Sequence, residues 1–182
     1  MRVAVTGTPG TGKTSAVEAL EASEDGVPNG LDVIHLNEVI EPEGLYEERD
    51  EERDSLVVDF DAITEYLDGR DDVVIESHLA HHLDVDRVIV LRCAPEEIER
   101  RLEQRGEDDP AKAESDASIA ENAESEAIDV ILAEAVDRHG REAVYEIETT
   151  DRTPETVASE IRAAIVGDRE PSAGTVDYTD YF

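Results

Sequence analysis

The chain of 182 residues carries 16 basic and 48 acidic side chains, a net charge of −32, and only 39% hydrophobic residues. Its length fits one domain with a core of its own. Its charge excludes a protein whose whole surface attracts nucleic-acid phosphates or anionic membranes. Only two basic residues are lysines, Lys13 and Lys112, and apolar runs recur along the chain. These features favour a folded, halophilic surface over disorder, which high charge with low hydrophobicity would also allow.

Three features of the sequence bear on the cellular compartment of the protein: its cysteine content, its longest apolar run and its N-terminus. A single cysteine, Cys93, excludes an internal disulfide, and its place at the end of an apolar run predicts a packing residue. No run approaches about 18 consecutive apolar residues, which argues against a transmembrane helix. A predicted strand follows Met1 directly, which argues against a signal peptide. We therefore expect a cytoplasmic protein.

Apolar segments of two kinds alternate along the chain. Short apolar runs predict strands, and runs with helical spacing predict helices. In chain order we expect strand 2–6, helix 13–24, strand 31–36, helix 59–67, strand 71–77, strand 86–92, helix 95–106, helix 119–139, strand 143–147 and helix 153–166. This alternation predicts an α/β fold with a parallel sheet.

Three polar segments interrupt this pattern. The acidic stretch 38–61 is almost entirely charged at its centre, which suits either a disordered loop or a solvated helical insertion. Residues 107–118 contain Pro110 and predict a loop, and the tail 168–182 is expected to be loosely ordered.

The sequence Gly7-Thr8-Pro9-Gly10-Thr11-Gly12-Lys13-Thr14 matches the pattern G-x-x-x-x-G-K-[ST] in full. A strand precedes it and a helix follows. Glycines let backbone N–H groups curl around phosphate oxygens, and the helix N-terminus adds its positive dipole end. Lys13 can place a charge at the β- and γ-phosphates, and Thr14 can offer its hydroxyl to Mg²⁺. The motif predicts a nucleotide-phosphate site.

The motif alone fits ATPases, GTPases and kinases. A GTPase-type base motif N-K-x-D is absent, because Lys112 is the only other lysine. The size and the two polar insertions favour a small-molecule kinase that closes flaps over its substrates to exclude water.

An ordered set of motifs makes the chain recognisable from Val3 to about Val136. After the glycine-rich loop come Leu45-Tyr46 with an acidic run, Val73-Val74-Ile75-Glu76-Ser77-His78, Leu91-Arg92, Arg101-Leu102-Glu103-Gln104-Arg105-Gly106, and Glu121-Asn122 with Glu126. This set resembles the adenylate kinase isoenzyme 6 family, whose members are small nucleoside monophosphate kinases and ATPases also implicated in ribosome maturation.

The resemblance implies a P-loop, NMP-kinase-like three-layer fold with a five-stranded parallel sheet. It implies one domain over residues 1–167, with a monophosphate-binding insertion at about 35–58, a lid at about 104–117, and an acidic tail from 168 to 182.

The resemblance also implies roles for individual residues. ATP would be bound by Gly10, Gly12, Lys13, Thr14, Ser15 and Arg105. Mg²⁺ would be held by Thr14 and, through water, by Glu76, which stands where the family has aspartate. The implied catalytic residues are Lys13, Glu76, His78 and Arg105.

Two parts of this assignment stay open. The lid lacks the family's usual tyrosine and lysine, so Arg105 is the closest match, Arg101 is the alternative, and Lys112 lies inside a longer insertion. The monophosphate could meet His35, Arg49 or Arg53. His78, His81 and His82 invite a zinc interpretation, but without a further set of cysteines or histidines we predict no zinc site.

Two functions follow from the resemblance. The first is an ATP:NMP phosphotransferase with ATPase activity, acting most readily on AMP. The alternative, which can coexist with it, is an ATP-dependent assembly factor that transiently binds ribosomal protein uS11 on the small-subunit precursor. A third reading is a kinase of another small hydroxylated substrate. No membrane partner and no direct nucleic-acid binding are expected.

Overall fold

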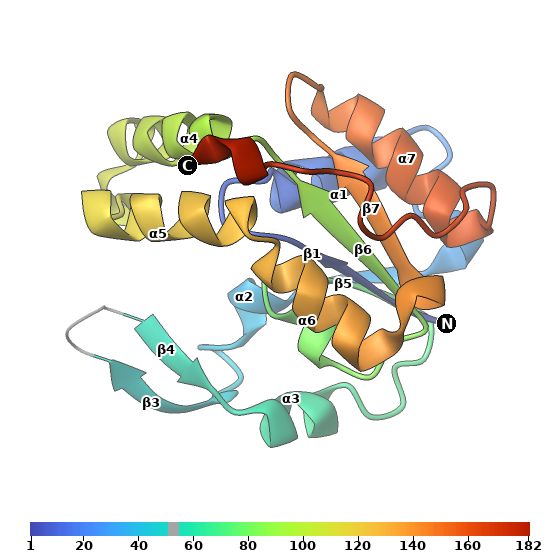
Figure 1. Ribbon diagram of the computed structural model, residues 1–182. Coiled ribbons are helices and arrows are strands. Elements are labelled where there is room, and N and C mark those ends of the chain that lie inside the picture. The colour runs from blue at the N-terminus through green and yellow to red at the C-terminus, as the bar shows by residue number, and fades with distance from the viewer. Residues whose placement is uncertain (51–54) are drawn as a thin grey trace.

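The computed structural model describes residues 1–50 and 55–182 and contains the predicted parallel sheet (Figure 1). The strands are β1 (Arg2–Thr6), β2 (Asp32–His35), β5 (Val73–Glu76), β6 (Arg87–Arg92) and β7 (Val144–Glu148). Their order is β2-β5-β1-β6-β7, and every neighbouring pair is parallel. The predicted fold class is thereby confirmed.

Helices cover both faces of this sheet because successive strand residues point to opposite sides. Val3 and Val5 pack with α1 (Lys13–Ala22) and α7 (Pro154–Val166). Ala4, between them, packs on the other face with α3 (Phe60–Tyr66) and α6 (Val130–His139). The pair α4 (Pro95–Asp108) and α5 (Asp116–Ala127) adds a smaller core that contains the fully buried Cys93, as predicted. In the described part of the chain, no helix has the length and apolar character needed to cross a membrane.

The helix predicted over residues 119–139 is two helices. It breaks at Ile128 and Asp129, where Asp129 takes a left-handed conformation with φ of 60°. In that conformation its carboxylate reaches the guanidinium of Arg92, which explains the break. The loop predicted over 107–118 is also shorter than expected, because α4 continues to Asp108 and Ser115 caps α5 by accepting from the backbone N–H of Ser118.

The described centre of the acidic stretch is an antiparallel hairpin, which differs from both the disordered loop and the helical insertion considered for it. After the short helix α2 (Leu36–Val39), an antiparallel hairpin joins β3 (Tyr46–Asp50) to β4 (Ser55–Val58). Tyr46, Leu56 and Val58 pack against the main core, and that packing supports the hairpin despite its charge. Arg53 and the other residues of the range 51–54 lie outside the described part of the chain.

The tail is ordered by specific contacts, which contradicts the predicted looseness. Backbone N–H groups of Thr175 and Val176 donate to Glu146 Oε2 at 2.6 and 3.3 Å. Arg169 donates to the backbone oxygen of Glu146, and Ala173 is buried. The physical reason is the buried carboxylate of Glu146, whose unpaired oxygen the tail satisfies.

Candidate active site

The glycine-rich loop runs from the end of β1 into the N-terminus of α1. Gly7 has φ of 143°, and a Cβ there would lie 2.4 Å from the backbone oxygen of Leu91, so only glycine fits. Gly10 has φ of 92° and would press a side chain against Ile98 and Leu102. Thr11 closes the loop by donating its hydroxyl to the backbone oxygen of Thr8 at 2.8 Å. The loop is therefore shaped for close approach by a ligand to its backbone.

Lys13 is the first residue of α1, and its side chain turns back into the loop. It is 8% exposed, and its Nζ donates to the backbone oxygen of Thr8 at 3.1 Å. Burial lowers the pKa of Lys13 to about 8, although Glu76 and Glu126 act in the opposite direction. The ammonium is thus charged at pH 7 but poorly solvated, and phosphate oxygens would supply the partners it lacks.

Thr14 and Glu76 meet at the carboxyl ends of β1 and β5, where the loop and strand adjoin. The Thr14 hydroxyl donates to Glu76 Oε1 at 3.4 Å; Thr14 is exposed, whereas Glu76 is 3% exposed. A hydroxyl and a carboxylate are hard oxygen donors that suit Mg²⁺ accompanied by water and phosphate. The two residues therefore fit the metal that the motif implies.

His35 holds the other oxygen of Glu76. Its Nδ1 lies 2.9 Å from Glu76 Oε2, and its Nε2 lies 3.2 Å from Glu21 Oε2. Burial alone would lower the pKa of His35, but the two carboxylates overcome that effect and raise it. The structure thus places His35 behind the Thr14–Glu76 pair as a positioning residue, a role the sequence did not reveal.

We expect His35→Gln to raise the Mg²⁺ concentration needed for half-maximal ATP turnover by roughly 10–100-fold. This is the loss of metal affinity that is typical when a partner of a metal-orienting carboxylate is removed. The measurement is a Mg²⁺ titration of ATP turnover at fixed nucleotide. Glu21→Gln is the control, because it removes only the outer, more exposed carboxylate that contacts His35 and leaves the contact between His35 and Glu76 in place. An unchanged Mg²⁺ dependence in His35→Gln would assign His35 a purely structural role.

His78 lies two residues beyond Glu76, half-buried at the start of the following turn. Burial lowers the pKa of His78 to about 4, and Lys13, His81 and His82 add to the effect. The ring is therefore neutral at pH 7 and can accept a proton or a hydrogen bond there. Its backbone oxygen accepts from the Thr6 hydroxyl at 3.2 Å, which fixes the turn relative to β1.

The two candidate arginines of α4 differ in position. Arg101 Nη1 donates to the backbone oxygens of Gly10 and Thr11 at 3.4 Å each, so it contacts the glycine-rich loop directly. Arg105 is 42% exposed and pairs with Glu114 across the α4–α5 junction. Its charge still acts on Lys13, whose pKa it helps to lower. Lys112 is far more exposed, at 66%, and pairs with Asp109.

A pocket of about 440 Å³ opens beside the loop on the α7 side. Arg101, Thr149 and Arg152 line it together with Ser15, which is exposed in the first turn of α1. Its size suits the base and sugar of a nucleotide whose phosphates lie on the glycine-rich loop. The sequence did not reveal this pocket, because the segment after β7 carries no recognisable motif.

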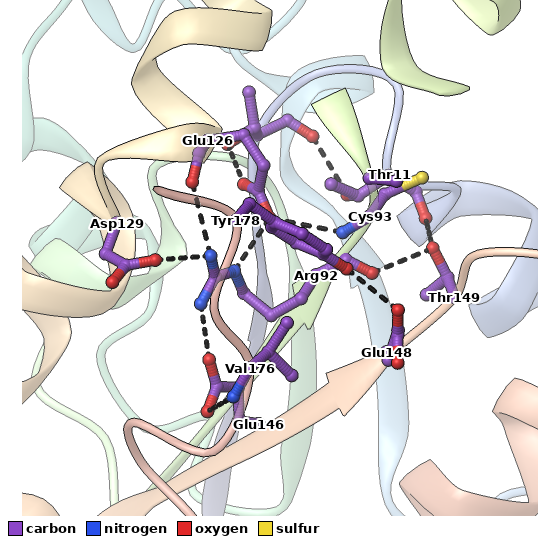
Figure 2. A network of polar contacts seen from close by, with 12 residues as sticks. Thr11, Arg92, Cys93, Glu126, Asp129, Glu146, Glu148, Thr149, Val176 and Tyr178 are labelled. Carbon is purple, nitrogen blue, oxygen red and sulfur yellow. Dashed lines mark hydrogen bonds and ion pairs between the residues drawn. The ribbon is translucent and has the colours of Figure 1, made fainter. Parts of the chain in front are cut away.

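A buried ion-pair network supports the same loop from behind (Figure 2). Thr8 donates its hydroxyl to Glu126 Oε2 at 2.5 Å, and Glu126 Oε1 accepts from Arg92 Nε at 2.7 Å. Arg92 is 1% exposed and also pairs with Glu146 and Asp129. Tyr178, from the tail, places its ring over the guanidinium, 5.4 Å from its centroid. The network ties the loop to α5, β7 and the tail.

Together the loop, the buried lysine and the hydroxyl–carboxylate pair define a P-loop nucleotide-binding domain. The family model described as "AAA domain" matches residues 3–129, and the chain belongs to that family. A protein of Natronomonas pharaonis is 60% identical to this chain, and the match covers 100% of this chain and 99% of that protein. A protein of Halobacterium salinarum is 58% identical with the same coverage. A protein of Methanocaldococcus jannaschii is 38% identical over the whole chain and 95% of its own length. All three are named "Putative adenylate kinase", and the chain belongs to their family.

Solved structures show the same fold at low sequence identity. A gluconokinase from Sinorhizobium meliloti has a TM-score of 0.53 at 17% identity, with 91% of each chain covered. A sulfotransferase from Alicyclobacillus acidocaldarius has a TM-score of 0.52 at 16% identity, covering 98% of this chain and 86% of its own. These likenesses support the P-loop kinase fold, while the narrower resemblance to isoenzyme 6 stays a prediction.

Proposed function

We propose that the protein is a nucleoside monophosphate kinase that transfers the γ-phosphate of ATP to AMP, with ATPase activity when the acceptor is water. The observation that carries this proposal is Lys13. In a chain with only two lysines, it is buried against the glycine-rich loop, beside Thr14 and Glu76. The names of the archaeal relatives support the same reaction.

Catalysis would consist of positioning and electrostatic stabilisation, because phosphoryl transfer needs little covalent chemistry from the protein. Backbone N–H groups from Gly10 to Ser15 would hold the triphosphate, and Lys13 would neutralise charge that develops between the β- and γ-phosphates. Thr14 and Glu76 would hold Mg²⁺, which supplies charge neutralisation on the phosphates when bound. The neutral ring of His78 would order the acceptor or a water near Lys13.

The moving parts would be the two insertions. Residues 104–117 span the end of α4 and the junction to α5, and Arg105 there would exchange Glu114 for the transferring phosphoryl group as the lid closes. A planar guanidinium suits this role because it pairs with two phosphate oxygens at once. Residues 35–58 would cover the monophosphate. His35 is engaged by Glu76 and Glu21, and Arg49 pairs with Glu41, so either side chain would have to exchange a carboxylate partner to meet the monophosphate.

A substrate panel tests the reaction. ATP turnover is measured in molar KCl, to match the expected salt adaptation, with ATP alone and with each nucleoside monophosphate. We expect ADP formation to rise most with AMP, and two ADP molecules to form for each AMP consumed. If no monophosphate increases ADP formation above ATP alone, the kinase assignment is wrong.

An assembly function is the second candidate. A net charge of −32 suits a basic ribosomal protein, although a salt-adapted surface would carry such a charge with any partner. The same panel includes purified uS11 with ATP, ADP or no nucleotide. Association that depends on the nucleotide would support this function. No association in any nucleotide state would exclude uS11 as the partner.

A further inference from the structure

Two adjacent histidines meet a carboxylate where the turn Ala80–His82 packs against α6. Nε2 of His81 lies 2.9 Å from Glu134 Oε2, and Nε2 of His82 lies 3.8 Å from the same oxygen. The three donor atoms are all within 4.8 Å of one another. Ligands that share one tetrahedral zinc ion are about 3.3 Å apart, given bonds of about 2.0–2.1 Å. Small side-chain rotations would therefore bring all three onto one ion.

The hydrogen bonds around His81 leave its Nε2 available to a metal ion. The Thr6 hydroxyl lies 3.2 Å from the backbone oxygen of His78 and 3.0 Å from Nδ1 of His81. In the tautomer that carries its proton on Nδ1, that proton is donated to the Thr6 oxygen and the lone pair of Nε2 points to Glu134. A cation would favour this tautomer, because it would bind Nε2 and the carboxylate together. Without a cation, the other tautomer donates Nε2–H to Glu134.

The surroundings match the outer shell of a metal site. A metal-bound histidine typically donates its second ring N–H to a fixed acceptor, and the Thr6 hydroxyl oxygen, 3.0 Å from Nδ1, would be that acceptor for His81. The backbone oxygen of His81 accepts from His139 Nε2 at 2.7 Å, which fixes the turn against the end of α6. The side chain of His81 is 2% exposed, whereas His82 and Glu134 are 35% and 48% exposed. The outer side is thus open to water as a further ligand.

We propose that His81, His82 and Glu134 bind one divalent transition-metal ion of the zinc class, with water completing its coordination. Two imidazole nitrogens and one carboxylate suit zinc, whereas Mg²⁺ prefers oxygen ligands throughout. The sequence argued against zinc because it offered only histidines, and Glu134 lies 53 residues beyond His81. The ion joins α6 to the turn that follows His78, so its role is structural and does not depend on the proposed kinase reaction.

Zinc binding to the untagged protein tests this site. After chelator treatment and dialysis into molar KCl, Zn²⁺ alone is titrated calorimetrically, and bound metal is counted by atomic spectroscopy. We expect one ion per chain. Glu134→Gln and His82→Gln should each weaken binding by roughly tenfold or more. Asp137→Asn is the matched control, because it removes an exposed carboxylate from the same helix, and its affinity should equal that of the wild type.

Thermal unfolding supplies a second readout without any activity measurement. Zn²⁺ should raise the midpoint of the wild type and of Asp137→Asn, but not that of Glu134→Gln or His82→Gln. Both substituted side chains are partly exposed, so the metal-free variants should unfold close to the metal-free wild type. The proposal is overturned if the wild type binds no stoichiometric Zn²⁺, if the two variants bind it equally well, or if Mg²⁺ at equal concentration displaces it.

Discussion

Replacing Lys13 by alanine should lower both AMP-dependent and AMP-independent ATP turnover by roughly 100–1,000-fold or more, which is the loss typical when a preorganised electrostatic group is removed from a transition state. The side chain is buried against the loop, and its nearest charged neighbours are carboxylates. Without its ammonium, the loop would lose the buried cation that offsets the charge of Glu76, and only the arginines of α4 would remain nearby. Repulsion of the triphosphate should therefore add a loss of ATP affinity to the loss of rate.

Lys112→Ala is a matched control for Lys13→Ala, since it removes the only other lysine and the same charge. Lys112 is 66% exposed and pairs with Asp109 in the α4–α5 junction. Initial rates and nucleotide binding are measured for both variants under the same salt. If the two variants lose turnover equally, the effect reflects net charge or the lid, and the assignment of the phosphate site to Lys13 is wrong.

The local features of the chain could be predicted from the sequence because they depend on neighbouring residues. Five apolar runs define the parallel strands, and the loop from Gly7 to Thr14 carries its own geometric requirements. Thr14 and Glu76 lie together because parallel topology brings the carboxyl ends of β1 and β5 to one edge of the sheet. These features follow from the spacing of apolar residues, the positions of the glycines and the order of the strands in the sheet.

The remaining features depend on contacts between distant segments. Nothing local in Asp129 indicates that it will break a helix to reach Arg92, 37 residues earlier. Nothing local in the tail indicates that Thr175 will bind Glu146. The hairpin of β3 and β4 was hidden because its charged residues mask the apolar positions that pack inward. In each case a buried group far along the chain selects the local conformation.

Arg92→Met should destabilise the protein by about 3–5 kcal/mol, because it leaves buried carboxylates without their cation. The guanidinium is 1% exposed, and the side chains of Glu126 and Glu146 are 4% and 0% exposed. Their carboxylates raise the pKa of Arg92 even against the cost of burial, so the guanidinium stays charged in the folded state. For a chain of this length, such a loss lowers the unfolding midpoint by about 6–20 °C. Scanning calorimetry or urea unfolding in molar KCl measures it.

Arg100→Met is the control, because Arg100 is 60% exposed on α4 and its pair with Glu97 should contribute only about 0–1 kcal/mol. The double variant Arg92→Met with Glu146→Gln separates charge from packing. Glutamine keeps an acceptor oxygen for the tail N–H groups while removing one unpaired charge, so the double variant should lose less stability than the sum of the single changes. Additive losses would mean that Arg92 stabilises the fold through its packing. In that case the ion pairs of Arg92 would not be what holds the tail and the glycine-rich loop together.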